Sequence, residues 1–151
     1  MILYHFTSLS HLPKICKSGF LKIGDIPLKQ TSNYGEDGHG VWFTTASSAN
    51  PEQHGLKNLL VDKTVVRFKV DIDEHSLQLF KWSDYAKMNK INKKWYETLD
   101  KVGGGLSHTW WLYIGEIDIR SSQVEISIKE NNVFIPKLTD HILKIHTPHP
   151  A

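Results

Sequence analysis

Apolar and polar residues alternate along several parts of the chain, and this alternation predicts strands. In residues 64–70, Val66, Phe68 and Val70 occupy every second position with basic residues between them, as expected of a strand with one buried face. Residues 124–128 show the same alternation. Runs of β-branched and aromatic residues predict further strands at residues 2–6, 41–45 and 109–114, and a short strand or extended segment at 133–135.

Helical spacing marks two other segments. Apolar residues from Leu9 to Cys16 recur in steps of three and four, and Gly19 follows as a left-handed cap that ends the predicted helix. Between Phe80 and Leu99 six apolar residues keep the same spacing, which predicts one amphipathic helix over residues 80–99. The other faces of this helix carry five lysines, namely Lys81, Lys87, Lys90, Lys93 and Lys94.

The segments between these elements are rich in turn-forming residues. Residues 24–40 read as a long loop, and loops of this length are more often functional than idle. Residues 46–55 are rich in turn residues, with room for a short helix, and residues 103–105 are three glycines that predict a hinge or loop tip. The whole pattern predicts one α+β domain over residues 1–140, followed by a flexible tail at 141–151.

Composition narrows the class of protein. The chain has 151 residues, of which 40% are hydrophobic and 23% charged, as in an ordinary folded domain. A single cysteine, Cys16, allows no disulfide within the chain, and no apolar run reaches the length of a membrane span. We therefore expect a cytoplasmic protein without a membrane partner. The nine histidines lack the spacing of metal ligands, so no metal site is predicted, and a net charge of +2 does not by itself indicate nucleic acid.

Three segments together resemble a known family. They are Tyr4-His5-Phe6-Thr7 on the first strand, Ser18-Gly19-Phe20-Leu21 at the end of the first helix, and Gly38-His39-Gly40-Val41-Trp42-Phe43-Thr44 on the second strand. In order and spacing they are similar to the ADP-ribosyltransferase superfamily, especially its poly-ADP-ribose polymerase and diphtheria-toxin-like branch. The tRNA 2′-phosphotransferases are more distantly similar. The resemblance covers the N-terminal third of the chain.

This resemblance implies a fold and a cofactor. The fold would have two small β-sheets around a nucleotide cleft, with flanking helices, and NAD would be the substrate. His5 would bond a ribose hydroxyl of NAD and Trp42 would stack on nicotinamide. Thr44 would face the cofactor on the side of Trp42, because side chains two apart on a strand share a face. The remaining cofactor-binding residues implied by the resemblance are Thr7, Phe43 and His108.

The catalytic glutamate of the family has two competing positions here. In one alignment Gln123-Val124-Glu125 matches the family's Gln-x-Glu pattern, and Glu125 is the third catalytic residue beside His5 and Trp42. In the other, residues 109–113 form the late strand and Thr109 stands at the glutamate position, without a carboxylate. A relative without the glutamate would act through basic residues, with His5, Arg67 and His108 as candidates.

Two functions follow from these residues. The first is NAD-dependent transfer of ADP-ribose to a macromolecular acceptor, protein or nucleic acid, by a small bacterial or phage effector. The second is a catalytically degenerate domain of the same fold that binds a nucleotide, RNA or a protein. The lysine-rich segment is either a solvated face or a docking surface for nucleic acid. For Trp42 taken by itself, the sequence favours a core position over a site role. Adjacent Trp110 and Trp111 should point to opposite faces of their strand.

Overall fold

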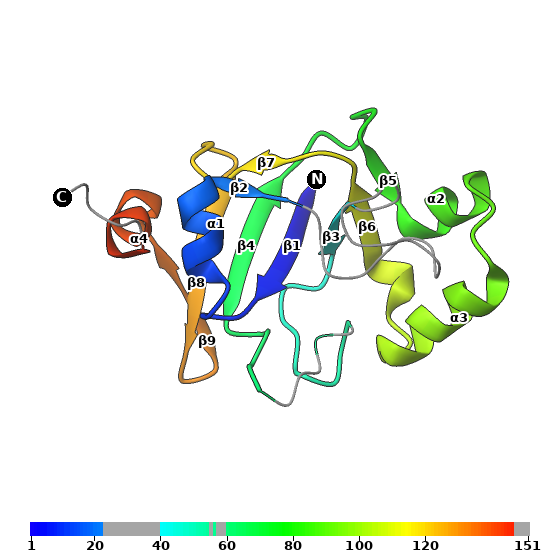
Figure 1. Cartoon of the computed structure of the whole chain (residues 1–151), viewed down its shortest axis with the longest axis horizontal. Helices are drawn as coiled ribbons and strands as arrows, with labels where there is room; N and C mark the ends of the chain where they lie inside the picture. The colour runs from blue at the N-terminus through cyan, green and yellow to red at the C-terminus, as the bar shows by residue number, and fades with distance from the viewer. Residues whose placement is uncertain (23–39, 55, 57–59, 147–151) are drawn as a thin grey trace.

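The computed structural model describes residues 1–22, 40–54, 56 and 60–146, and these form a mixed α+β fold (Figure 1). A seven-stranded sheet has the order β5-β6-β3-β1-β4-β8-β9, and every neighbouring pair in it is antiparallel. Its strands are β1 (Ile2–Thr7), β3 (Val41–Thr44), β4 (Val66–Asp71), β5 (Leu79–Lys81), β6 (Trp110–Tyr113), β8 (Val124–Glu130) and β9 (Val133–Lys137). A separate two-stranded sheet pairs β2 (Phe20–Leu21) with β7 (Ile117–Asp118).

Four α-helices and one short 3-10 helix flank the strands in the described part of the chain. They are α1 (Leu12–Ser18), α2 (Trp82–Met88), α3 (Lys93–Val102), α4 (Thr139–His146) and η1 (Ser107–Thr109). Helix α1 ends at Gly19, which takes the left-handed conformation with φ of 79° that the sequence predicts for a helix cap. Among the described residues no helix is long and apolar enough to cross a membrane.

Two hydrophobic clusters lie on opposite faces of the large sheet. The first cluster packs the alternating apolar residues of β1, β4 and β8 against α1 and α4, with Phe68 and Leu12 fully buried. The second packs α2 and α3 against β6 and includes Trp82, Trp110 and Leu112. The alternation of β6 separates the two, because Trp110 belongs to the second cluster while Trp111 packs against the first. The prediction that these two tryptophans face opposite ways is therefore confirmed.

The large sheet is loosely joined in its middle. Strands β1 and β4 share six paired residues, whereas β1 and β3 are paired only where Tyr4 lies opposite Thr44. The sheet therefore divides into a four-strand half (β1, β4, β8 and β9) and a three-strand half (β3, β5 and β6). We call the boundary between them the β1–β3 junction. The resemblance implied two small sheets, and the structure has instead one large sheet with a weak joint, plus the β2–β7 pair.

The long helix predicted over residues 80–99 is wrong in its extent. Residues 79–81 form β5, and two helices follow, separated by a turn in which Lys90 has a φ of 51°. The turn forms because Asn89 ends α2 and the side chain of Asn92 caps α3 by accepting a hydrogen bond from the Trp95 amide. The apolar spacing continues across the turn because apolar side chains of both helices pack into the second cluster.

Other expectations are met in part. The predicted strands at residues 2–6, 41–45, 64–70, 109–114, 124–128 and 133–135 all form, with small shifts at their ends.

Residues 46–54 contain turns rather than a helix, and most of the predicted 24–40 loop lies outside the described residues. Residues 141–146 of the predicted tail belong to α4, and Ile142 is buried in the first cluster. Residues 147–151 lie outside the description.

Candidate functional site

A small cavity of about 70 Å³ lies at the β1–β3 junction. Strands β1 and β3 supply most of its wall. These two strands share only one paired position, Tyr4 opposite Thr44. Four of the seven site residues predicted from sequence line it: His5, Trp42, Phe43 and Thr44. The other lining residues are Tyr4, Phe6, His54, Leu56 and Trp110.

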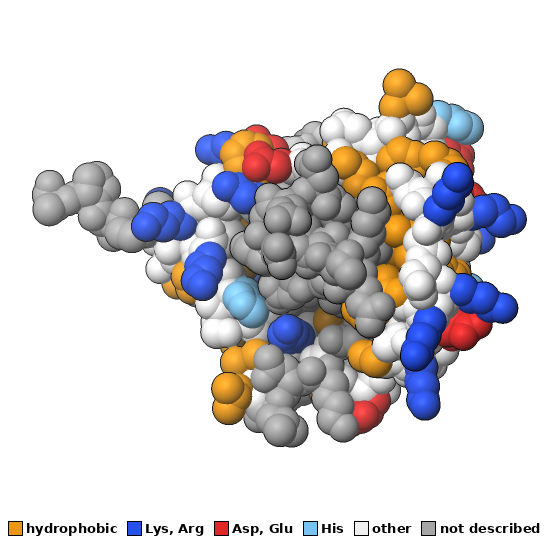
Figure 2. Space-filling model, turned by 45° about the vertical axis from the view of Figure 1, so that its right-hand side comes forward, with side chains coloured by type: hydrophobic (Ala, Val, Ile, Leu, Met, Phe, Trp, Pro, Cys, Tyr) orange, Lys and Arg blue, Asp and Glu red, His pale blue; other side chains and the backbone are white. Residues whose placement is uncertain are grey.

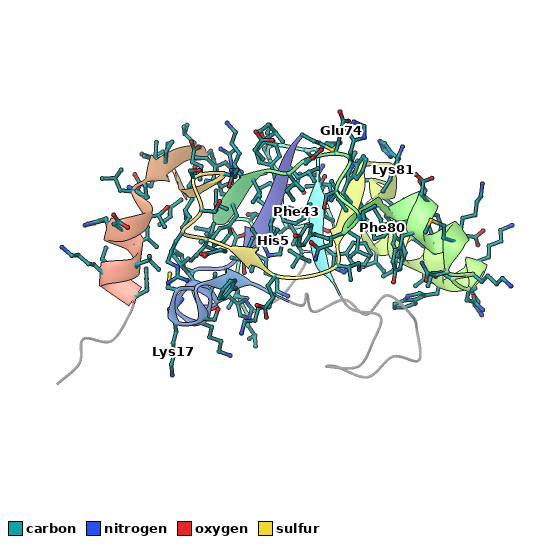
Figure 3. The ribbon with its side chains drawn as sticks, turned by 90° about the horizontal axis from the view of Figure 1, so that it is seen from above. His5, Lys17, Phe43, Glu74, Phe80 and Lys81 are labelled. Carbon is teal, nitrogen blue, oxygen red and sulfur yellow. The ribbon has the colours of Figure 1, made fainter. Side chains whose placement is uncertain are left out.

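The imidazole of His5 bridges the two strands at the junction. Its Nδ1–H donates a hydrogen bond of 2.8 Å to the backbone carbonyl of Trp42, so the proton must sit on Nδ1, because a carbonyl oxygen can only accept. The ring lies against Phe43 and Phe68, with centroid distances of 5.9 and 6.3 Å. His5 and Phe43 are side by side at the centre of the sheet (Figure 3). Two described rings in contact with His5 are thus Phe43 and Phe68, whereas Trp42 bonds it through its backbone carbonyl.

Trp42 projects from the opposite face of the sheet. Its ring contacts Trp82 and Trp110 edge-on, at 4.8 and 5.7 Å. Thr44 shares this face with Trp42, as their spacing predicts, and its hydroxyl bonds the hydroxyl of Thr109 at 2.8 Å. The junction therefore presents His5 and Phe43 on one face and Trp42 and Thr44 on the other, coupled through the Trp42 backbone.

His54 and Trp110 complete the cavity wall, and the sequence analysis did not identify them as a pair. The indole Nε1–H of Trp110 donates to His54 Nδ1 at 2.9 Å, which leaves the imidazole proton on Nε2. That Nε2–H is buried and has no hydrogen-bond partner among the described residues. Burial also lowers the pKa of His54 from its ordinary value, so the ring is neutral at pH 7. A residue of the cavity wall thus holds a buried donor that no described residue satisfies.

Glu125 is not part of this site. It lies on β8, exposed to solvent and opposite Lys69 of β4, and β4 in turn separates β8 from β1. With strands about 4.8 Å apart, the β8 backbone is on the order of 10 Å from β1. The sequence-predicted trio of His5, Trp42 and Glu125 is therefore not assembled in this structure.

The remaining predicted residues lie around the junction without lining the cavity. Thr7 is buried at the end of β1, opposite Val66 of β4. His108 is exposed on η1, one residue before the Thr109 that bonds Thr44. Among the described residues no group of three His, Cys, Asp or Glu side chains is placed to hold a metal ion.

A larger, open groove of about 580 Å³ lies elsewhere, beside β7 and the ends of β4 and β8. Four carboxylates line it, from Asp71, Asp73, Glu116 and Asp118. Two of them form ion pairs, because the N-terminal amine contacts Asp71 at 3.1 Å and Arg120 contacts Asp118 at 3.1 Å, and Asp73 accepts a hydrogen bond from the His75 amide. A groove of this charge repels the phosphates of a nucleotide, so the β1–β3 junction is the better candidate.

Comparisons with protein-family models, with curated proteins and with solved structures find no match, so function is inferred from the sequence and from the geometry of the junction.

Proposed function

We propose that this chain is an ADP-ribosyltransferase-like protein that binds NAD, or a related ADP-ribosyl or 2′-phosphate nucleotide, at the β1–β3 junction. One observation carries the proposal. Two separate sequence motifs, one holding His5 and the other Trp42, Phe43 and Thr44, meet where β1 and β3 share one paired position and where the small cavity lies.

The cavity is suited to one ring of the nucleotide. Ligand pockets usually enclose about 300–1,000 Å³, so a cavity of about 70 Å³ receives only part of a dinucleotide. We assign it to the nicotinamide end, because the walls are aromatic and His54 Nε2–H is a buried donor without a partner among the described residues. The carboxamide oxygen of nicotinamide is an acceptor that would satisfy this donor.

The proposed chemistry is transfer of ADP-ribose to a macromolecular acceptor, and it does not use Glu125. Loss of nicotinamide leaves positive charge on the ribose, and a nearby carboxylate stabilises such a charge. The described residues that line the cavity include no Asp or Glu. The late strand beside the cavity is β6, and Thr109 precedes it, which favours the alignment without a glutamate. A hydroxyl orients a ribose but carries no full charge, so we expect slow turnover.

The same observation favours a second candidate, a domain that binds the nucleotide without transferring it. The two functions share the binding step and differ only in whether nicotinamide is released. A single experiment with two readouts therefore separates them.

The experiment is calorimetric titration of NAD, with nicotinamide release followed in parallel by chromatography. His5→Asn keeps a donor toward the Trp42 carbonyl but removes the ring, and Trp42→Phe keeps an apolar side chain of smaller area. Each should weaken NAD binding about two- to tenfold, the effect of losing one hydrogen bond or ring contact. The matched control is His75→Ala, whose side chain is 88% exposed and distant from the cavity lining, and it should bind as wild type does.

Glu125→Gln tests the choice between the two alignments. We expect this variant to bind NAD and to release nicotinamide as wild type does, because the carboxylate is exposed on a strand beyond β4. Loss of release with intact binding would identify Glu125 as catalytic. Binding without release in wild type would establish the binding-only function, and no binding at millimolar NAD would refute the nucleotide site.

A further inference from the structure

Residues 81–101 contain six lysines that form a separate charged surface. They lie on or beside α2 and α3, and all are exposed: Lys81, Lys87, Lys90, Lys93, Lys94 and Lys101. Against three carboxylates they give this segment a formal charge of +3, while the whole chain carries only +2. Figure 2 shows lysine and arginine side chains spread along the outer rim of this part of the molecule. We call residues 81–101 the lysine lobe.

Few of these charges are neutralised by neighbours. Within the described part of the chain only Lys93 has an ion-pair partner, Glu97 at 3.9 Å, and both side chains are largely exposed. Such a pair contributes little attraction in water. The carboxylate of Asp100 is engaged by Ser107, because it accepts hydrogen bonds from the amide and hydroxyl of that residue. The outer surface of the lobe is therefore strongly positive.

The lysines are held on a rigid support. The ring of Trp82 stacks on Tyr85 and on Tyr96, at 6.3 and 5.7 Å, and so ties α2 to α3. Asn92 caps the start of α3. The charges consequently project from two fixed helices, which reduces the conformational entropy that a partner would have to overcome on binding.

We propose that the lysine lobe is a docking surface for the phosphodiester backbone of a nucleic acid. Charge complementarity with a polyanion is the first argument. The second is that the lobe contains lysine and no arginine, since lysine acts as a point charge while arginine reads bases and carboxylates through a planar fork. The third is that Trp82, Ala86 and Leu99 are buried in the second cluster and Met88 is the one large hydrophobic residue of the lobe that is exposed, so the lobe offers little apolar surface to a lipid.

This role goes beyond the nucleotide site and does not depend on it. A lobe without arginine should bind through phosphates, with little preference for sequence and with a steep dependence on salt. The edge contact of 4.8 Å between Trp82 and Trp42 joins the lobe to the β1–β3 junction.

The test measures fluorescence anisotropy of labelled oligonucleotides, single-stranded and duplex, DNA and RNA, without NAD. We compare wild type with the triple variant Lys87→Gln, Lys90→Gln, Lys94→Gln. The matched control replaces three exposed lysines of α1 and α4, as Lys14→Gln, Lys17→Gln, Lys144→Gln, and so changes the net charge equally. Lys17 points outward from α1, far from the lobe in Figure 3.

We expect the lobe variant to lose at least about tenfold in affinity at low salt and the control to lose less than about threefold. The slope of log affinity against log salt for duplex should fall by about 2–3 in the lobe variant, because each phosphate that a lysine no longer neutralises lowers it by about 0.9. Equal losses in both variants would mean that net charge alone drives binding and would overturn the proposal. Absence of binding to every oligonucleotide at low salt, or stronger binding to acidic vesicles or acidic peptides than to nucleic acid, would also overturn it.

Discussion

The two halves of the sheet bury their residues in different ways. The four-strand half buries its apolar side chains in the first cluster, which is mostly aliphatic, includes the fully buried Phe68 and is joined by Val41, Phe43 and Leu79 of the other half. The three-strand half packs against a cluster in which Trp42, Trp82, Trp95 and Trp110 gather, and two of these indoles have a buried N–H without a partner among the described residues. The aliphatic half is specified by simple alternation and acts as the scaffold. The aromatic half depends on individual ring contacts and carries both the cavity and the lysine lobe.

Removing a central ring from the scaffold should have the largest effect on stability. Phe68 is fully buried on β4, where it belongs to the first cluster and its ring lies against His5. Phe68→Ala should lower the free energy of unfolding by about 3–5 kcal/mol, as measured by urea denaturation. The control is Lys69→Ala on the same strand, whose side chain is half-buried and whose loss should change stability by less than about 1 kcal/mol.

The same experiment asks whether the two halves unfold together. Phe43 and Trp111 of the three-strand half pack against the first cluster, so the halves share a core despite their single pair of linked residues. We expect tryptophan fluorescence and far-ultraviolet circular dichroism to give one coincident transition. Two separate transitions would show that the β1–β3 junction divides the protein into independent units.

A crowding substitution in the aromatic half should have an intermediate effect. A Cβ atom at Gly103 would lie 2.3 and 2.5 Å from two carbons of the Trp110 ring. Gly103→Ala should therefore cost about 1–3 kcal/mol and shift Trp110, which bonds His54 in the cavity wall. Thermal unfolding measures the cost, and near-ultraviolet circular dichroism reports the tryptophan environment.

The comparison variant is Gly105→Ala. This position has open space around it but a φ of +75°, so its cost arises from the backbone alone. It should lower stability by about 1 kcal/mol and leave the near-ultraviolet spectrum unchanged. If Gly103→Ala behaved in the same way, Trp110 would not be tightly confined.

Local patterns predicted the scaffold because each of its elements is specified by neighbours in sequence. The alternation of Val66, Phe68 and Val70 places them in the core, and Gly19 ends α1 as expected. The prediction of a single helix over residues 80–99 was wrong because the apolar spacing is maintained across the turn between α2 and α3. Two cap residues, Asn89 and Asn92, mark the turn in the sequence. A search for apolar periodicity does not take cap residues into account.

The sequence predicted only those cavity-lining residues that belong to the two short motifs. His5, Trp42, Phe43 and Thr44 belong to two short motifs, and they do line one cavity. His54 pairs with Trp110 across 56 positions, and no local pattern connects them. The alignment that assigns Glu125 rests on a short pattern as well, but the position of its strand relative to the cavity depends on strand order, which local sequence does not determine.

Loss of the cap between the two helices should have a smaller effect. Asn92→Ala removes the side chain that accepts from the Trp95 amide, at a cost of about 1 kcal/mol in thermal or urea unfolding. Asn92→Asp or Asn92→Ser, which also accept, should restore most of that stability. An alanine variant as stable as wild type would mean that ring stacking on Trp82 alone fixes α3.

The smallest expected effect is a pH dependence that originates at His54. Burial lowers the pKa of this histidine in the folded protein below its ordinary value of 6.5, while the unfolded chain keeps the ordinary value. As the pH falls through 6.5, the unfolded state therefore binds a proton before the folded state does. Folding stability contributed by this position is unaffected above that pH, falls as the pH drops below it, and stops falling below the folded pKa.

His54→Gln isolates this contribution from the other eight histidines. The free energy of unfolding of the variant, measured by urea between pH 7.5 and 5, should decline less steeply than that of wild type. His75→Ala, at an exposed position, serves as the control and should keep the wild-type slope. Parallel slopes for wild type and His54→Gln would contradict a neutral, buried imidazole. The same titration bears on the cavity, because a proton on Nδ1 would end its acceptance of the Trp110 N–H, so tryptophan fluorescence and NAD affinity should change together as the folded protein is acidified.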